Sequence, residues 1–107
     1  MRNMRLAFTV CFWLWLYSFP LVFAQNSSDN RLLSNPVFQE NCAKCHGKTA
    51  EGRHFGGPSL RSEKVATASP DDLRTIISEG KGHMPKYSGK LTSVEIDTLV
   101  EEIKALK

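Results

Sequence analysis

One short run of residues, Cys42-Ala43-Lys44-Cys45-His46, limits what this chain of 107 residues can fold into. In a helical turn, Cys42 and Cys45 are three positions apart and project to one side. Two such thiols can each add to one of two neighbouring vinyl groups at a porphyrin edge, and His46 then reaches the iron. This C-x-x-C-H spacing is typical of a c-type haem attachment site, so it predicts one covalently attached haem c.

Other interpretations of the two cysteines fit the sequence less well. A disulfide between Cys42 and Cys45 would close a very small loop and add little stability. A thioredoxin-like redox pair needs a βαβ context, which the sequence does not indicate. A zinc site would need further ligands such as His54 and His83, and the adjacent Cys45 and His46 suit one tetrahedral centre poorly.

The apolar residues are concentrated near the N-terminus. Residues 1–24 hold 18 of the 44 apolar residues and seven of the ten aromatic residues. The remaining 83 positions hold 26 apolar residues and three aromatic ones, Phe38, Phe55 and Tyr87. So few large apolar groups form a thin core, which excludes a second domain and indicates that a cofactor completes the interior.

Residues 1–24 are predicted to be a secretory signal peptide. Arg2 and Arg5 precede an uncharged run from Leu6 to Phe23, and the stretch ends with residues on which a signal peptidase can act. The alternative is an uncleaved anchor, because a run of 18 residues just reaches the length that spans a bilayer. Association with a membrane is expected only for the uncleaved form, but the rest of the chain is exported in both.

The net charge of the chain gives little information about partners. Without residues 1–24, the formal net charge falls from +3 to +1. The basic residues are single and scattered, and no aromatic platform accompanies them, so nucleic acid is not expected as a partner.

A flexible polar lead-in is predicted for residues 25–34, followed by one domain at residues 35–107. The first helix of this domain has Asn35 as its N-cap and Pro36 in its first turn. It is short and ends at the cysteines of the C-x-x-C-H run.

Two longer helices are predicted further along the chain. Ser69 caps the first of them, acidic residues follow at its positive end, and Gly80 ends it. The other begins with a capping box of Thr92 and Glu95 and keeps apolar residues at helical spacing to the C-terminus.

Two irregular stretches, residues 47–68 and 81–91, make up 33 of the 83 positions after the signal. Neither stretch alternates apolar and polar residues, so no strand is expected. A compact domain rarely holds so much loop unless the loops wrap something, which again indicates a cofactor.

A second axial ligand to the iron is predicted in the later stretch. Met84 is the only methionine outside the signal. Its loop contains glycines that let it bend and Pro85 that fixes it, which suits presenting one side chain to a flat ring. A neutral sulfur ligand favours reduced iron and raises the reduction potential. His83 is the alternative ligand, and His54 is expected at the surface or near a haem propionate.

From residue 35 onward, the chain resembles a class I c-type cytochrome of the small bacterial monohaem type. Beside the C-x-x-C-H run, Gly57-Pro58-Ser59-Leu60 resembles the G-P-x-L motif, and Met84-Pro85-Lys86-Tyr87 resembles the M-P-x-aromatic motif. Phe38 matches the aromatic residue by which the first helix crosses the last. The resemblance implies an all-α small cytochrome c fold, with three main helices and long loops wrapped around one haem.

The resemblance also implies roles for particular residues. The carbonyl of Pro58 is expected to accept a hydrogen bond from the free nitrogen of His46, while Leu60 packs against the ring. The expected cofactor-binding residues are Cys42, Cys45, His46, Met84, Pro58, Leu60 and Tyr87, with His46 and Met84 on the metal.

Two departures from the family pattern concern the periphery of the haem. The exported part has no tryptophan to bond a propionate, which leaves Arg53, His54 or Arg61 for this role. The last helix has Glu102 where an aromatic residue is common, so Leu99 and Ile103 are the expected neighbours of Phe38.

Two protein ligands leave no site on the iron for a substrate, so the expected function is outer-sphere electron transfer between redox proteins, not catalysis. Respiratory complexes or dehydrogenases are the expected donor and acceptor. The expected form is a monomer in the bacterial periplasm or at the outer face of the cytoplasmic membrane. Two alternatives remain, a tethered haem subunit of a larger oxidase or dehydrogenase and a small haem enzyme with a labile sixth ligand.

The segments near the cysteines and the methionine carry lysines, whereas acidic residues crowd the last helix. This distribution predicts a basic rim that docks to acidic partners through a transient, salt-sensitive interface. The rim consists of Lys44, Lys48, Lys81, Lys86 and Lys90. The alternative is a solvated surface with no preferred face.

Overall fold

The computed structural model describes residues 27–106, which form six helices and two long loops. The helices are α1 (Ser27–Ser34), α2 (Pro36–Asn41), α3 (Ala43–His46), α4 (Glu63–Thr67), α5 (Pro70–Glu79) and α6 (Ser93–Lys104). The described residues contain no strand, apart from an isolated bridge between Lys81 and Met84. The fold of this part is therefore all-α, as the sequence predicts.

The three predicted helices correspond to α2, α5 and α6, and their predicted caps are confirmed. Asn35 and Ser69 each accept a hydrogen bond from a backbone amide in the first turn that follows. At the start of α6, the Thr92 amide donates to Glu95 Oε2 over 2.8 Å, and the Glu95 amide donates to Thr92 Oγ1 over 3.2 Å. Gly80, with a φ of 77°, ends α5. These local bonds explain why the helices begin and end at these residues.

Two short helices add to the three predicted ones. The α3 helix, Ala43–His46, corresponds to the helical turn that the sequence predicted for the C-x-x-C-H run. The α4 helix interrupts residues 47–68, which were predicted to be irregular throughout. Its N-cap is Ser62, whose hydroxyl accepts a hydrogen bond from the Val65 amide. The cap signal is the same as in the longer helices, but the apolar stripe is too short to identify the helix from sequence.

The α1 helix covers most of the segment predicted as a flexible lead-in. It packs against both α6 and α2, and the side chain of Leu32 is completely buried. Just after α1, Asn35 Nδ2 donates a hydrogen bond of 2.7 Å to Glu102 Oε2. Residues 27–34 thus form a docked helix, because Leu32 adds a large apolar side chain to a core that has few. The signal peptide predicted for residues 1–24 lies outside the described residues.

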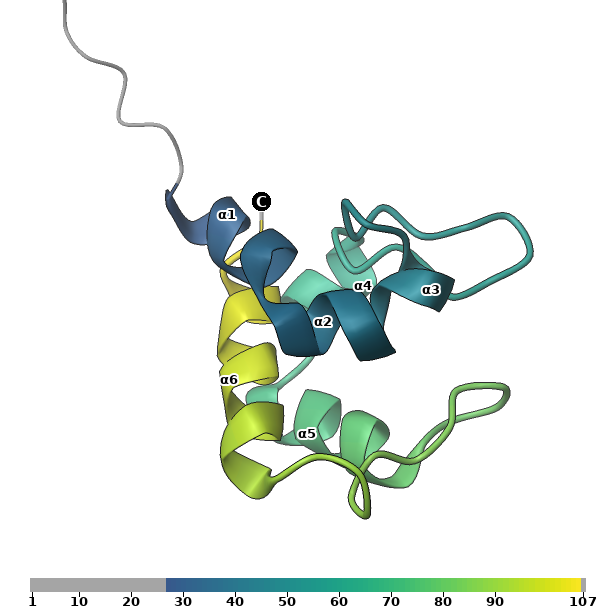
Figure 1. Ribbon diagram of the computed structural model, residues 1–107. Coiled ribbons are helices and arrows are strands. Elements are labelled where there is room, and N and C mark those ends of the chain that lie inside the picture. The colour runs from purple at the N-terminus through teal and green to yellow at the C-terminus, as the bar shows by residue number, and fades with distance from the viewer. Residues whose placement is uncertain (1–26, 107) are drawn as a thin grey trace, which may run out of the picture.

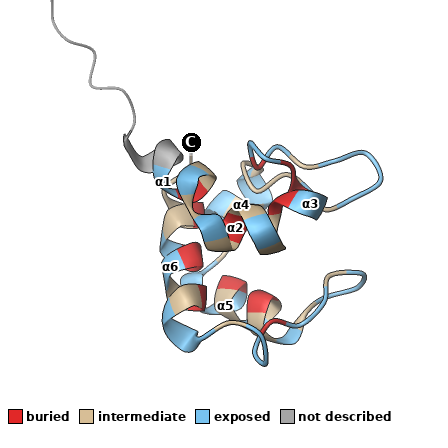
Figure 2. Cartoon of the chain, viewed as in Figure 1, coloured by how far each residue is buried: buried red, intermediate tan, exposed pale blue. Residues whose placement is uncertain are grey.

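The core joins α1, α2, α5 and α6. Phe38, Leu99 and Ile103 are all buried in it, as the departure at Glu102 led us to expect. The helices present buried residues to one another and exposed residues outward (Figure 2). The loops that follow α3 and α5 both extend on the side away from α6 (Figure 1). Among residues 27–106, no helix is long and apolar enough to cross a membrane.

Candidate haem-binding site

The C-x-x-C-H run forms one tight turn at the start of α3. Cys42 is the N-cap, and its carbonyl accepts hydrogen bonds from the amides of Cys45 (3.1 Å) and His46 (2.9 Å). Both cysteines are free thiols, Cys42 partly buried and Cys45 exposed. Within residues 27–106, no three His, Cys, Asp or Glu side chains gather to hold a metal ion by themselves. The turn thus offers two thiols from one short segment.

The two thiols and the hydroxyl of Tyr87 influence one another electrostatically. Burial and, to a smaller extent, the charge of Cys45 raise the pKa of the Cys42 thiol to about 11, although the charge of Lys90 acts in the opposite direction. Burial also raises the pKa of Tyr87, with contributions from Cys42 and then Cys45. The Cys42 thiol is therefore neutral near pH 7, and the ring of Tyr87 belongs to the same environment.

The ring of His46 is buried and oriented by the backbone. Its Nδ1 lies 2.7 Å from the carbonyl oxygen of Pro58, and because a carbonyl only accepts, Nδ1 is the donor. In the neutral imidazole, this bond makes Nε2 the nitrogen with the free lone pair, as a metal-ligating nitrogen requires. A Cβ atom built at Gly57 would lie only 2.7 Å from His46 Cε1. The ring thus rests directly on the backbone in a space that only glycine leaves open.

Residues 47–61, which we name the histidine loop, fold back onto the C-x-x-C-H turn. The Gly52 amide donates to the His46 carbonyl over 2.6 Å, and the Gly57 amide donates to the Cys45 carbonyl over 2.8 Å. Further along, the Leu60 amide donates to the carbonyl of Ala50, which is fully buried at a φ of 62°. Leu60 itself is partly buried against the core. The loop is therefore bonded to the backbone of the same turn that carries the His46 ring.

Residues 80–91, which we name the methionine loop, begin with a small hairpin. The amides of Lys81 and Met84 each donate to the other residue's carbonyl, over 3.2 and 3.0 Å. Gly82, with a φ of 59°, allows the turn between them, and a Cβ atom at Gly80 would lie 2.5 Å from the Met84 carbonyl oxygen. The Met84 side chain packs against the core, whereas His83 is exposed. Of the two candidate ligands, Met84 is therefore the one that the hairpin holds against the core, and His83 is the one at the surface.

Tyr87 connects the methionine loop to the segment that bears the cysteines. Its hydroxyl donates a hydrogen bond of 2.7 Å to the carbonyl of Asn41, the residue before Cys42. Its own amide donates to the Ile77 carbonyl on α5 over 3.1 Å, and Lys90 Nζ lies 5.9 Å from the ring centroid. The carbonyl of Asn41 was not identifiable as a site group from sequence, because a backbone acceptor leaves no signal in the residue type.

The three residues considered for the propionates all lie in the histidine loop. Arg53 Nη1 donates to the Lys44 carbonyl over 2.9 Å, and Arg61 Nε donates to the Thr49 carbonyl over 3.0 Å. His54 is exposed. The guanidinium group of Arg53 therefore joins the loop to α3, and that of Arg61 joins two parts of the loop.

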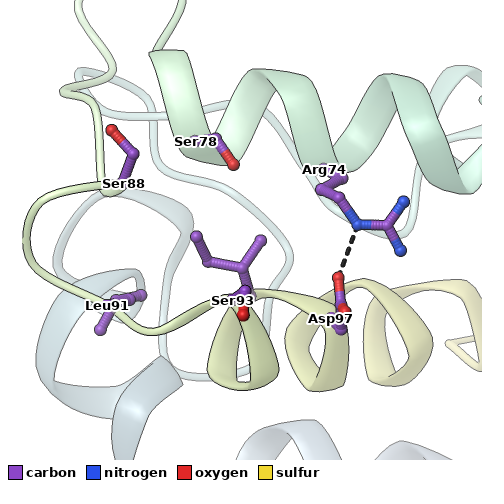
Figure 3. A pocket seen from close by; sticks show the side chains of 7 residues that line it. Arg74, Ser78, Ser88, Leu91, Ser93 and Asp97 are labelled. Carbon is purple, nitrogen blue, oxygen red and sulfur yellow. Dashed lines mark hydrogen bonds and ion pairs between the residues drawn. The ribbon is translucent and has the colours of Figure 1, made fainter.

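A hollow lies between α5 and the start of α6 (Figure 3). Arg74 crosses it, with Nε 2.5 Å from Asp97 Oδ1 and Nη1 2.6 Å from Asp71 Oδ1. The hydrogen bond and charge of Asp97 raise the pKa of this guanidinium, and Asp71 adds to the effect. None of the predicted site residues lines this hollow. The ion pair between Arg74 and Asp97 joins α5 to α6 at this point.

Comparison with known proteins places this site in a family. Over residues 34–101, the chain matches the family described as Cytochrome C oxidase, cbb3-type, subunit III. It is 36% identical over 70 residues to the cbb3-type cytochrome c oxidase subunit FixPc of Rhizobium leguminosarum bv. viciae. The aligned residues make up 63% of this chain and 23% of that protein. It is 38% identical over 50 residues to cytochrome c-551 of Bacillus subtilis, covering 47% of this chain and 42% of the relative.

Cytochrome c6 of Microcystis aeruginosa is closer in length. It is 27% identical over 74 residues, which make up 64% of this chain and 88% of the relative. By contrast, the chain spans about a quarter of the length of the FixP proteins that it matches. The similarity to those longer proteins therefore concerns one part of each of them.

The helical fold, the C-x-x-C-H turn and these relatives together define a small class I c-type cytochrome. The chain belongs to the Cytochrome C oxidase, cbb3-type, subunit III family. With one C-x-x-C-H run, it carries one covalently attached haem c. The residues fit this group, because the site offers two free thiols beside an imidazole whose Nδ1 is engaged and whose Nε2 is available.

Proposed function

We propose that this protein is an electron carrier that exchanges single electrons with other redox proteins, without an enzymatic activity of its own. Its haem is attached through Cys42 and Cys45, and the iron is held by His46 and Met84. When bound, the haem supplies an iron centre that can change its charge by one. The task of the chain is to hold this group in one coordination in both oxidation states.

The observation that best supports this proposal is the orientation of the two ligand side chains. The Pro58 carbonyl fixes the His46 ring with its Nε2 available, and the hairpin of Lys81 and Met84 packs the methionine against the core. Two ligands that the backbone fixes in advance leave no coordination position for a substrate. They also need little movement when the charge changes, which favours electron transfer over catalysis.

The other predicted residues support the same arrangement. Leu60 is partly buried against the core, and Tyr87 is buried beside the two cysteines. In the proposed arrangement, both side chains exclude water from the haem ring, and this exclusion raises the reduction potential of the haem together with its sulfur ligand.

Ligand substitution tests the coordination directly. In the oxidised protein, Met84→Ala is expected to abolish the near-infrared charge-transfer band of a sulfur–iron bond and to lower the reduction potential. His83→Ala is the matched control, because His83 is the neighbouring residue and is exposed. It should leave both the band and the potential unchanged. A band that survives in Met84→Ala, or is lost in His83→Ala, would contradict the proposed ligand.

The proposed partners are redox proteins such as respiratory complexes or dehydrogenases, met after export to the periplasm or to the outer face of the cytoplasmic membrane. All five lysines of the basic rim are exposed. Of the acidic groups of α6, Asp97 forms an ion pair with Arg74, whereas Glu102 accepts a hydrogen bond from the uncharged amide of Asn35. A basic face toward the haem loops favours acidic partners, and rates of electron transfer should fall between low and moderate ionic strength.

A second candidate function is that of a haem subunit fixed within a larger oxidase. The family and the FixP relatives, whose names describe oxidase subunits, favour it. Extraction of membranes from the source organism with mild detergent separates the two. When the extract is separated by size-exclusion chromatography, a free carrier elutes at the mass of one chain with its haem. A fixed subunit elutes together with an oxidase.

A further inference from the structure

Phe55 is unusual among the few aromatic residues of the described chain. Of the three, Phe38 and Tyr87 are buried in the core, but Phe55 is 98% exposed. In this part of the chain, the other large apolar residue that is strongly exposed is Val94, at the start of α6. A domain that has few large apolar groups therefore leaves one of its aromatic rings in water.

The exposure of Phe55 is fixed by the backbone. Residues 53–57 form a closed turn, in which the Arg53 amide donates to the Gly57 carbonyl and the Gly56 amide donates to the Arg53 carbonyl, both over 3.1 Å. A Cβ atom at Gly56 would lie 2.5 Å from the Cys45 carbonyl oxygen, so the turn lies directly on the C-x-x-C-H segment. The ring at the tip is therefore presented outward before any partner arrives, which lowers the entropy lost on binding.

Cationic groups surround this ring. Phe55 lines a shallow hollow together with Cys45, Lys44, Arg53, His54 and Gly56. The ring of His54 meets the ring of Phe55 edge to face, with centroids 4.5 Å apart. Arg53 is held in place by its hydrogen bond to the Lys44 carbonyl. The surface thus combines one apolar projection with basic neighbours, beside a thiol that attaches the haem.

We infer that Phe55 is the apolar anchor by which this protein docks to a membrane-bound redox protein, and that the partner offers an apolar pocket bordered by carboxylates. This inference rests on the proposed electron-carrier function and identifies the chemistry of the partner. The charge of Lys44 and Arg53 selects the carboxylates, and the ring supplies the contact that remains when salt screens the charges. Docking at this point brings the partner next to the cysteine end of the haem.

Kinetics with native membranes test this inference. The reduced holoprotein is mixed with membranes prepared from the source organism, and haem oxidation is followed as a function of protein concentration. Phe55→Ser is expected to raise KM about tenfold or more, with kcat within about twofold of the original. Phe55→Leu should restore much of the affinity. Val94→Ser, which removes a similar exposed group from α6, should leave KM unchanged.

Two further measurements separate docking from a change at the haem. The reduction potential and the rate of oxidation by ferricyanide, a small reagent that needs no docking site, should be unchanged in Phe55→Ser. At raised ionic strength, the effect of Phe55→Ser on KM should persist, whereas that of Lys44→Gln should fade.

Three results would overturn the inference. They are a KM for Phe55→Ser within twofold of the original, an equal rise in Val94→Ser, and an equal loss of rate with ferricyanide. If membranes do not oxidise the unsubstituted protein at all, the proposed function fails and the inference fails with it. That result is distinct from normal oxidation that does not depend on Phe55.

Discussion

The two loops that present the proposed iron ligands are held in different ways. The histidine loop is bonded directly to the C-x-x-C-H turn, through the amides of Gly52 and Gly57 and the ring of His46. The methionine loop relies on its own hairpin, on bonds to α5, and on the long-range hydrogen bond from the Tyr87 hydroxyl to α2. His46 thus lies on the same bonded segment as the two cysteines. The loop of Met84 is connected to that segment through the hydrogen bond of the Tyr87 hydroxyl.

This difference indicates which side of the site opens first. Breaking the histidine loop disrupts the turn that bears both cysteines, so it should require unfolding of the whole domain. The methionine loop can separate from the core while α5 and α6 remain packed, because its hairpin bonds are internal. Local openings of this kind have lower free energies than global unfolding. We therefore expect Met84 to be the more labile ligand.

The largest expected effect comes from the core that both loops share. Leu32→Ala removes a fully buried side chain and should lower the free energy of unfolding by about 3 kcal/mol, measured by denaturant titration of the holoprotein. In native-state hydrogen exchange, the Gly57 amide should lose protection by the same amount. The Met84 amide should keep its protection, because its loop opens without global unfolding.

Val94→Ala is the control for Leu32→Ala, because Val94 is 72% exposed, and a shift within about 0.5 kcal/mol is expected. If the Met84 amide loses as much protection as the Gly57 amide in Leu32→Ala, the two loops open together. The comparison between them would then be wrong.

A smaller effect is expected from crowding the histidine. Gly57→Ala places a methyl group 2.7 Å from the His46 ring, so the ring or the loop must shift at a cost of about 2 kcal/mol. Gly89→Ala in the methionine loop is the matched control, since no atom lies within 4 Å of the added group. Denaturant titration should show a change only for Gly57→Ala. Equal stability of the two variants would refute the tight seating of the ring.

The smallest effect concerns the hydrogen bond from the Tyr87 hydroxyl to α2. Tyr87→Phe keeps the ring but removes the hydrogen bond to the Asn41 carbonyl, a loss of about 1 kcal/mol. The Met84 amide should then exchange about fivefold faster. The Gly57 amide should lose the same protection, because global unfolding breaks this bond as well. The methionine loop is then distinguished by the two variants together, since its Met84 amide should respond to Tyr87→Phe and not to Leu32→Ala. An unchanged Met84 amide in Tyr87→Phe would show that the Tyr87 hydroxyl does not hold the methionine loop.

Local sequence signals predicted much of this architecture. Asn35, Ser69 and the pair Thr92 and Glu95 identified the helix starts, because a cap is a contact between residues two or three positions apart. The motif around Cys42 predicted the attachment turn for the same reason.

Features that depend on distant partners could not be predicted. Leu32 looked like part of a polar tether, since its burial depends on α6, about 70 residues further along the chain. The Tyr87 hydroxyl finds a backbone carbonyl 46 positions away, which no residue type signals. The sequence did not predict whether the side chain of Phe55 is buried or exposed, because only the closed turn at residues 53–57 decides its exposure.

The central claim is that Cys42 and Cys45 attach one haem, on which the interior of this molecule is built. Intact mass of the protein, matured in a host equipped for haem attachment and extracted with acidified acetone, tests it directly. The account predicts a chain heavier by one haem that stays coloured after extraction, and a colourless product from the double variant Cys42→Ala/Cys45→Ala. A folded, colourless protein with the mass of the bare chain would contradict it.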